Sequence, residues 1–420
     1  MDFGEKIAMD SGENIEETTT AVDRISQLSD DLLLHILSLM PTEAALVTSA
    51  LSKRWRYLWK SLDSFSFSTF GNYEWYVSYV DYVLGHSVSP KIKKFQLDSN
   101  EPDAYKSDMD RWLSFAIEKK VENLKIQSVS EEEVYALPEC LYTCSSLITL
   151  VVGFCSFDAN VAVAWKSLKS IKLKWMVLSN DHIVNLLSGC PILETMELFR
   201  FKGFSRLEIR SSKLKRLNLI AYNDDELDHS LEIVAPYLQH LEICESLYGF
   251  KCRLVDVSSL VNAKLTFEIT CPVHVAVQRG VNSRIEMQAA MYLSLIVFCF
   301  QPDATFCCFG LQDLVKENNI NLQRWISIFV LPNLKNVKIV ISSRICLINH
   351  LNWSYAKNLF ELSEFLLKNA LVLEKFVIIS KRRRCEKCSM NCAYKYLFPL
   401  AEKLLGSPRL STNSVIIFRE

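Results

Sequence analysis

The pattern of apolar and polar positions along this chain changes period once, from helical to strand-like. The first part, residues 23–68, has helical spacing. Its first apolar face comprises Leu32, Leu33, Ile36, Leu37 and Met40. Ser29 stands before Asp30 and Asp31, which predicts an N-cap with acidic residues in the first turn. Pro41 closes the predicted helix because a proline has no backbone N–H with which to continue it.

Two further short helices complete this predicted unit. Thr42 is expected to cap a second helix that runs through Val47. A third apolar face follows at helical spacing and comprises Leu51, Trp55, Leu58 and Trp59. Three short helices in about 45 residues bury little apolar surface, so the unit is expected to need a partner or the next domain for stability.

Beyond residue 68 the pattern becomes L-x-x-L-x-L, with any apolar residue at its three places, and recurs at intervals of 21 to 29 residues. The successive copies begin at Ile92, Val121, Leu147, Leu168, Leu193, Leu214, Leu238 and Leu260. Such intervals are typical of leucine-rich repeats, each of which contributes one strand and a return segment. A single repeat cannot bury its apolar edge, so we expect the copies to stack into a curved solenoid over residues 69–270.

Three segments add detail to this prediction. An extra copy of the pattern at 204–209 does not fit the interval and predicts an additional strand. The segment 181–187 (DHIVNLL) predicts a short helix on the convex side. Residues 271–330 interrupt the rhythm as an irregular insert or as degenerate repeats, and the pattern returns at Leu334 and Leu373.

Composition and charge narrow the possible functions. The chain has 420 residues, of which 50% are hydrophobic and 23% charged, and its formal net charge is −1. These values predict two or three folded domains and no general attraction to nucleic acid or to an anionic membrane. Residues 1–22 are acidic and nearly lack aromatic side chains, so they are expected to form a disordered tail.

The distribution of apolar residues also bears on location. No secretory pattern opens the chain, and the longest apolar run, 289–300, is too short for a helix across a bilayer. We therefore expect a cytoplasmic or nuclear protein whose 14 cysteines are reduced thiols, packed as small apolar side chains. Cys155, eight positions after Leu147, occupies the place where the repeat consensus has Asn or Cys.

Candidate chemical sites are few. The chain lacks the common enzyme motifs and its seven histidines are dispersed, so we expect no catalytic site and no cofactor. Cys385, Cys388 and Cys392 are spaced like zinc ligands, but a structural zinc site needs a fourth ligand, so a hairpin loop is favoured. The basic run 381–384 (KRRR) could serve nuclear localisation or bind phosphate; a solvated loop is favoured.

Three stretches of the helical unit resemble a plant F-box. They are 23–33 (DRISQLSDDLL), 36–44 (ILSLMPTEA) and 48–59 (TSALSKRWRYLW). Two departures are visible: Ser29 stands where the family usually has Pro, and Met40 and Glu43 replace the Leu and Lys of its Leu-Pro-Thr-Lys. Neither change removes an apolar contact, but Glu43 reverses a charge at the domain surface.

Later segments resemble the same family. The segment 188–194 (SGCPILE) resembles its repeat signature. The segments 369–376, 404–405, 407–409 and 415–418 resemble its FBD domain. The resemblance is thus to the plant F-box/FBD/LRR-repeat family, and it implies an α/β fold: a three-helix F-box over 23–68, a leucine-rich-repeat solenoid, and the last repeats with an α+β FBD domain over 331–420.

The resemblance implies a division of labour without catalysis. In the family the F-box binds a Skp-type adaptor, and through it a cullin, while the repeats bind a target protein. The apolar residues expected to contact the adaptor are Leu28, Leu32, Ile36, Leu37, Pro41, Leu51 and Trp55. The alternative role for such residues is the core of the helical unit. The core is favoured for Ile36, Trp55 and Trp59, and the adaptor contact for Leu28, Pro41 and Leu51.

The polar strand residues on the concave side form a mosaic of charges. Candidates for contact with a target are Lys172, Lys174, Glu197, Arg216 and Glu242, which are expected at one level of neighbouring strands. Adjacent strands lie about 4.8 Å apart, so Lys172 and Glu197 could form an ion pair. The mosaic is either a platform for a target or a set of exposed ion pairs worth little to stability.

The function expected from all this is substrate recognition in an SCF-type (Skp–cullin–F-box) ubiquitin ligase. Two alternatives remain open. One is a scaffold that binds the adaptor without delivering a substrate, and the other is a receptor in which a small molecule joins the target to the concave face.

Overall fold

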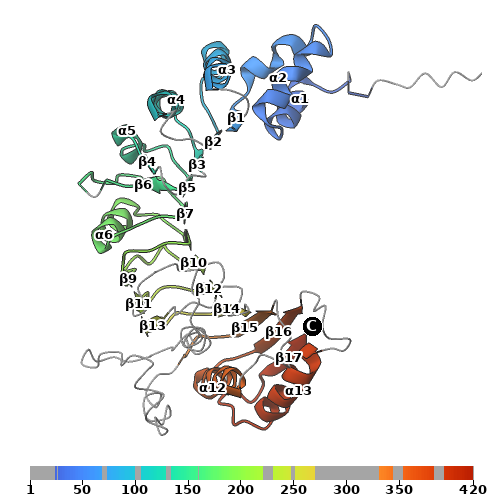
Figure 1. Ribbon diagram of the computed structural model, residues 1–420, viewed down its shortest axis with the longest axis vertical. Coiled ribbons are helices and arrows are strands. Elements are labelled where there is room, and N and C mark those ends of the chain that lie inside the picture. The colour runs from blue at the N-terminus through green and yellow to red at the C-terminus, as the bar shows by residue number, and fades with distance from the viewer. Residues whose placement is uncertain are drawn as a thin grey trace, which may run out of the picture.

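The computed structural model describes residues 24–25, 27–68, 73–99, 106–128, 134–158, 160–220, 230–246, 251–269, 331–343, 353–382 and 392–419. In Figure 1 the chain forms an arc whose inner side is one long β-sheet and whose outer side carries most of the helices. A small helical unit lies at the N-terminal end of the arc. The predicted acidic tail and the 271–330 insert lie outside the described residues.

The helical unit begins as its apolar spacing predicts. Helix α1 (Asp30–Ser38) has Ser29 as its N-cap, whose hydroxyl accepts a hydrogen bond from the backbone N–H of Leu32. Helix α2 (Thr42–Val47) ends at Val47 as predicted. The third apolar face, in contrast, does not form one α-helix. Leu51 follows the 3₁₀ helix η1 (Thr48–Ala50), and the other three residues of the face lie in the 3₁₀ helix η2 (Trp55–Ser61).

The prediction that Thr42 caps the second helix is wrong. Pro41 occupies the N-cap position and Thr42 is the first helical residue, with only 2% of its surface exposed. Its hydroxyl instead accepts a hydrogen bond of 2.7 Å from the backbone N–H of Ser66. Thr42 therefore ties the helical unit to the strand that follows it.

That strand is the first of a twelve-stranded parallel sheet. Each neighbouring pair of strands in the sheet is parallel, and the strands follow one another in chain order. The strands are β1 (Ser64–Ser68), β2 (Lys94–Ser99), β3 (Asn123–Ser128), β5 (Thr149–Gly153), β7 (Ser170–Lys174), β8 (Thr195–Phe199), β10 (Arg216–Ile220), β12 (His240–Ser246), β14 (Asn262–Ile269), β15 (Asn336–Ser343), β16 (Lys375–Arg382) and β17 (Val415–Arg419).

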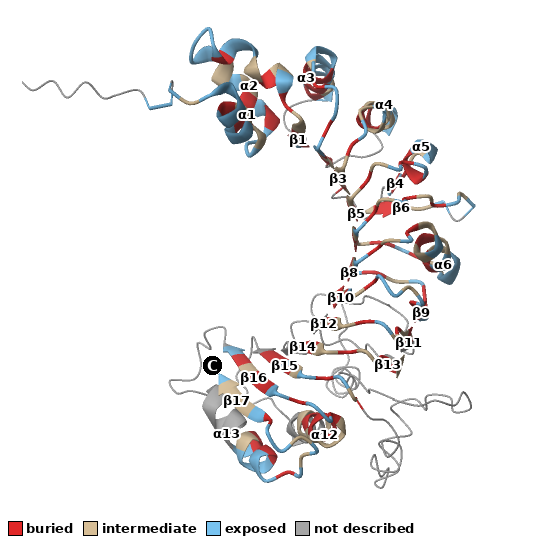
Figure 2. Ribbon diagram, turned by 180° about the vertical axis from the view of Figure 1, so that it is seen from behind, coloured by how far each residue is buried: buried red, intermediate tan, exposed pale blue. Residues whose placement is uncertain are grey.

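The predicted repeat register is confirmed by burial. The residues that open the eight predicted copies, Ile92, Val121, Leu147, Leu168, Leu193, Leu214, Leu238 and Leu260, are all buried. Along each strand the following apolar positions alternate with more exposed ones, as for Ile171 and Leu173 in β7. Figure 2 shows buried residues, in red, along the strands of the inner sheet and on the helices of the outer side.

The return segments on the convex side differ along the arc. Near the N-terminus they contain α3 (Tyr73–His86), α4 (Lys106–Glu118), α5 (Glu139–Tyr142) and α6 (Asn180–Gly189), the last of which is the predicted short helix. Two short strands of these segments, β4 (Tyr135–Ala136) and β6 (Cys155–Ser156), pair with each other in parallel. Further on, β9 (Arg206–Glu208), β11 (Ser230–Val234) and β13 (Lys251–Asp256) form a second parallel sheet (Figure 1). Strand β9 is the additional strand predicted from 204–209.

The sheet continues across the insert without a break in register. Asn262 of β14 lies opposite Asn336 of β15 although the insert separates them in sequence. The C-terminal part adds α12 (Trp353–Asn369) and α13 (Cys392–Leu405). Its strands β16 and β17 extend the same sheet, so this mixture of helices and strands is continuous with the repeats.

The helical unit covers the first edge of the sheet and shares its core. Leu33, Leu37 and Trp59 belong to the same buried cluster as Phe65 of β1. The Lys60 carbonyl accepts a hydrogen bond of 2.9 Å from the N–H of Val88. The domain that follows thus stabilises the small unit, which buries too little apolar surface to be stable alone.

Candidate functional site: two interaction surfaces

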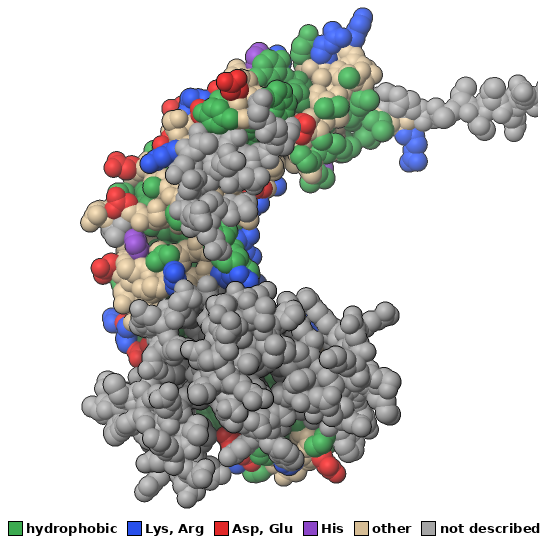
Figure 3. Space-filling view, in the orientation of Figure 1, with side chains coloured by type: hydrophobic (Ala, Val, Ile, Leu, Met, Phe, Trp, Pro, Cys, Tyr) green, Lys and Arg blue, Asp and Glu red, His purple; other side chains and the backbone are tan. Residues whose placement is uncertain are grey.

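The helical unit presents apolar side chains to solvent on the side away from the sheet. Leu32 is 52% exposed, Ile36 41% and Leu51 67%. Further exposed apolar residues of the unit are Ile25, Leu39, Met40, Val47 and Tyr57. Figure 3 shows hydrophobic side chains gathered over this end of the molecule. Contiguous exposed apolar surface of this kind marks an interaction site.

The seven predicted contact residues differ in their exposure to solvent. Leu32, Ile36, Pro41 and Leu51 are exposed, and Leu28 is partly buried. Leu37 and Trp55, at 1% and 8% exposure, lie in the core, so neither offers a side chain to a partner. The expectation that Ile36 belongs to the core is wrong.

The burial of Trp55 agrees with the core role favoured for it. The geometry of helix α1 explains the errors at Ile36 and Leu37. Successive residues of a helix are about 100° apart, so Leu33 and Leu37 face the core while Leu32 and Ile36 point aside. Helical spacing alone does not indicate which of these two pairs of residues faces the core. Leu39 (75%) and Val47 (67%), which the sequence reasoning missed, are among the most exposed apolar residues of the unit.

Polar contacts hold the N-terminal end of this surface in place. The Arg54 guanidinium donates to the Asp30 carboxylate at 2.8 Å and to the Leu28 carbonyl at 2.5 Å. Glu43, the family departure, is exposed in the first turn of α2, where a negative charge is favourable to the helix dipole.

The second surface is the concave face of the sheet, and its predicted residues occupy three levels. Lys172, Glu197 and Glu242 are in register, across β7, β8 and β12, through Asn218 of β10. Arg216 lies two residues earlier along its strand and Lys174 two residues later. The prediction of a single level is therefore wrong, although period-two alternation places all five on one face.

The predicted ion pair on this face is present. The Lys172 ammonium lies 2.5 Å from the Glu197 carboxylate. Lys264 on β14 pairs in the same way with Glu242 at the same level. Lys125 on β3 pairs with Asp98 on β2 at 3.0 Å. Such exposed pairs contribute little to stability, but they fix which charges remain available to a partner.

Lys174 differs from its neighbours. Among the described residues no carboxylate lies within ion-pair distance of it, and its ammonium donates only a long 3.4 Å hydrogen bond to the Gln127 side chain. Partial burial, followed by repulsion from Lys172 and Lys125, lowers the pKa of Lys174. The surrounding carboxylates Asp98 and Glu197 only partly oppose this effect.

An aromatic stack adjoins Lys174 at the ends of the strands. Phe154, Trp175 and Arg200 directly follow β5, β7 and β8, and each has a positive φ (52°, 54° and 48°). The Phe154 and Trp175 rings stack at 4.9 Å, and the Arg200 guanidinium lies 4.1 Å over the Trp175 ring. No sequence pattern indicated this arrangement.

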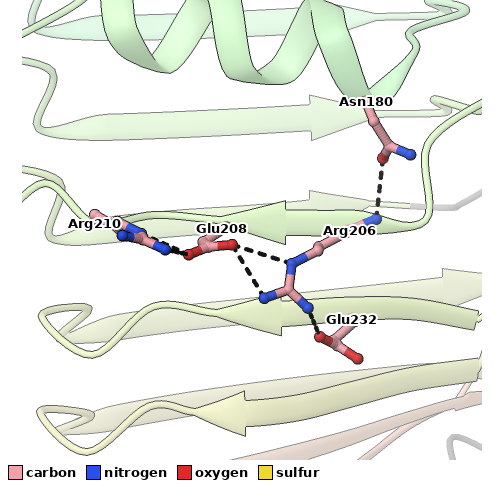
Figure 4. Close-up of polar contacts among 5 residues, drawn as sticks. All are labelled: Asn180, Arg206, Glu208, Arg210 and Glu232. Atoms are coloured by element: carbon pink, nitrogen blue, oxygen red, sulfur yellow. Dashed lines mark hydrogen bonds and ion pairs between the residues drawn. The ribbon is translucent and has the colours of Figure 1, made fainter. Parts of the chain in front are cut away.

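A charged network on the convex side has a structural role. Figure 4 shows the Arg206 guanidinium between Glu208 of its own strand and Glu232 of β11. Arg210 also binds Glu208, and hydrogen bonds from Arg210 and then Arg206 lower the pKa of that carboxyl. The Asn180 side chain accepts a hydrogen bond from the Arg206 backbone, which links α6 to the second sheet.

The other sequence candidates contribute no described site. Cys385 and Cys388 lie outside the described residues, as do Arg383 and Arg384; of Cys392 only the backbone is described. Lys381 and Arg382 belong to the end of β16 rather than to a loop. In the described part of the chain no group of three or more His, Cys, Asp or Glu side chains could hold a metal ion. None of the described helices is long and apolar enough to cross a membrane.

Stacked parallel strands with convex return segments, preceded by a helical unit with exposed apolar side chains, define a leucine-rich-repeat protein with an N-terminal helical module. Comparisons with known proteins agree. The F-box domain family matches residues 25–67. The family described as "FBD-associated F-box protein At5g56370, LRR repeats" matches residues 109–266.

Similarity to individual proteins identifies the family of the chain. It is 32% identical over 302 residues to the putative FBD-associated F-box protein At5g56440 of Arabidopsis thaliana, covering 69% of this chain and 67% of the relative. It is 31% identical over 301 residues to the F-box/FBD/LRR-repeat protein At4g26340 of the same plant, covering 69% and 68%. The chain belongs to the plant F-box/FBD/LRR-repeat family.

Some relatives match over a smaller share of their length. The F-box/LRR-repeat protein At3g03360 of Arabidopsis thaliana is 36% identical over 258 residues, which are 58% of this chain and 52% of that protein. The chain thus spans about half the length of this relative.

Proposed function

We propose that this chain is the substrate-recognition subunit of an SCF-type ubiquitin ligase. The F-box docks on a Skp-type adaptor, which connects it to a cullin, and the repeats hold a target protein. The observation that carries the proposal is the exposed apolar face of Leu32, Ile36 and Leu51 on a unit that the family comparison identifies as an F-box.

The packing between the two parts supports a role as a spacer of fixed geometry. The F-box and the first strand share one core, joined by the Thr42–Ser66 hydrogen bond and by an ion pair of 2.6 Å between Lys93 and Asp63. A target on the concave face is then held at a constant position relative to the adaptor. The subunit makes no bond itself; it raises the effective concentration of a target lysine near an activated ubiquitin.

Binding of a purified Skp-type adaptor tests the docking step. We expect the double variant Leu32→Ser, Leu51→Ser to bind at least about 30-fold more weakly, because each truncated apolar contact in the centre of an interface costs more than about 1 kcal/mol. Both side chains are exposed, so the melting temperature should change little.

Val184→Ser is the matched control, since Val184 is 66% exposed but lies on α6, far along the arc. It should leave adaptor affinity unchanged. Equal affinity of the wild type and the folded double variant would refute the proposed docking surface.

A further inference from the structure

The concave face holds a positive charge, on Lys174, that has no carboxylate partner among the described residues. Of three neighbouring lysines, Lys125 and Lys172 are each neutralised by an ion pair. Lys174, in contrast, has only the long hydrogen bond to Gln127. Partial burial, and then repulsion from Lys172 and Lys125, lower the pKa of Lys174, in keeping with an ammonium that has no carboxylate beside it. A carboxylate at this place would therefore be attracted more strongly than at either neighbour.

The surface beside Lys174 lacks a side chain. Gly153 of β5 lies opposite Lys174 in the sheet register. A Cβ atom at Gly153 would come within 3.3 Å of the Gln127 side chain and 3.6 Å of Lys174 Cβ. The glycine thus leaves Lys174 and Gln127 as the groups that a ligand would meet at this level. Figure 3 shows Lys and Arg side chains along the inner edge of the arc.

The adjoining residues supply an apolar half to the same surface. Phe199 occupies the position next to Lys174 on β8, half-buried, with its ring 5.9 Å from that of Trp175. Trp175 and Phe154 are also only partly buried. The Lys174 cation therefore lies next to Phe199 in the sheet register, and Trp175 and Phe154 directly follow β7 and β5 at the same end of the sheet.

The backbone holds this arrangement at a cost. The left-handed region is unfavourable for a residue other than glycine, and here three neighbouring strands are each followed by one. The N–H groups of Phe154, Trp175 and Arg200 donate to the last carbonyl of the next strand, at 3.0, 2.8 and 2.8 Å. Strained residues of this kind cluster at binding sites, where they fix side chains in place.

We propose that this part of the concave face, formed by Lys174, Trp175 and Phe199 around Gly153, binds an acidic segment of the target protein. A carboxylate of the segment pairs with Lys174, and an aromatic or aliphatic side chain next to it packs on Phe199 and the Trp175 edge. The inference rests on the proposed function, in which the repeats hold a target, and it names the chemistry of that target.

Selection from a displayed library of random peptides tests the proposal. The bait is the full chain bound to its adaptor. We expect enriched peptides to carry Asp or Glu beside an aromatic or aliphatic residue, and their affinity to fall as salt rises. The variant Lys174→Met should weaken the enriched peptides at least about tenfold, the loss expected for one charge-assisted contact. The control Lys213→Met, an exposed lysine outside this surface, should not.

A second variant separates binding from structural support. Trp175→Gly removes the ring while the new residue accepts the positive φ without strain. Weaker peptide binding with an unchanged melting temperature supports the proposal. A lower melting temperature with unchanged binding assigns the stack to structure alone and overturns its part in the site.

The outcomes distinguish this inference from the proposed function. Enrichment of peptides without acidic residues, or an affinity that Lys174→Met leaves unchanged, would overturn the acidic-segment site. The adaptor affinity of the same variants reports separately on the F-box. If adaptor binding is intact but no acidic peptides are enriched, the acidic-segment site is wrong and the proposed function as a substrate receptor is unaffected.

Discussion

The hydroxyl of Thr42 accepts a 2.7 Å hydrogen bond from the backbone N–H of Ser66, and this contact joins the first helical residue of α2 to the first strand of the solenoid. Thr42 is buried, so no water can readily replace its oxygen. The junction lies between the helical unit, which carries the proposed adaptor contacts, and the sheet that forms the concave face.

Removing the Thr42 hydroxyl should loosen the junction. We expect Thr42→Ala to lower the free energy of unfolding by about 1–3 kcal/mol, since it leaves the partly buried Ser66 N–H without a partner. Thr42→Ser keeps the hydroxyl and should lose much less. Denaturant unfolding of both variants, with hydrogen exchange at Ser66, measures the difference; equal stability of the two would show that the bond contributes nothing.

The end of α4 offers a stabilising substitution. Lys120 has a positive φ of 55°, its N–H donates to the Ile117 carbonyl, and the Val121 N–H donates to the Ala116 carbonyl. These bonds form the common helix-terminating motif in which glycine is preferred at the left-handed position. Lys120→Gly should therefore raise the free energy of unfolding by about 1 kcal/mol.

The neighbouring residue provides the control for this change. Lys119 still donates its N–H to Phe115 in helical fashion, so Lys119→Gly should destabilise by about 0.5–1 kcal/mol. Thermal unfolding of the two variants should shift in opposite directions. A shift in the same direction would contradict the described helix end.

The repeat register can be tested at the centre of the sheet. Leu217 is fully buried in β10, so Leu217→Asp would place a carboxylate in the core and cost more than about 3 kcal/mol. The adjacent Asn218 is only partly buried, and Asn218→Thr, a β-branched residue that suits a strand, should be tolerated. Thermal melting distinguishes the two. A Leu217→Asp protein as stable as the wild type would mean that the register is wrong.

Cysteine reactivity tests the packing of the return segments. Burial raises the pKa of both Cys155 and Cys190 to about 12, so at pH 8 each remains a protonated thiol in the folded protein. Because the thiolate is the reactive form, iodoacetamide should leave both unmodified until denaturant is added. The exposed Cys140 should react without denaturant. Peptide mapping that found Cys155 modified as fast as Cys140 would contradict the fold.

The repeats were predictable because burial imposes a strict pattern on a stacked sheet. Leu168, Ile171 and Leu173 show the alternation plainly, and all three are buried as expected. The first strand was missed as a repeat, although Leu62, Phe65 and Phe67 have the same spacing, because it follows the F-box motif without an interval. The interval between copies and the spacing of apolar residues within a copy together identify a repeat. Either one alone is a weaker indication.

The candidate sites were harder to predict because exposure depends on tertiary packing. The same helical spacing fits Leu33 and Leu37, which are buried, and Leu32 and Ile36, which are exposed. Backbone conformation is less visible still. Nothing in the residue type of Trp175 indicates a positive φ, which arises from hydrogen bonds between the ends of adjacent strands.

The half-life of captured companions tests the central claim of a substrate receptor most directly. Proteins that co-purify with the chain while the proteasome is blocked are identified first. Cells depleted of this protein are then supplied with either the wild type or the Leu32→Ser, Leu51→Ser variant, and the decay of those companions is followed. We expect fast decay with the wild type and slow decay with the variant, although both should bind the companions equally. Equal decay in the two cases would contradict a role in target degradation.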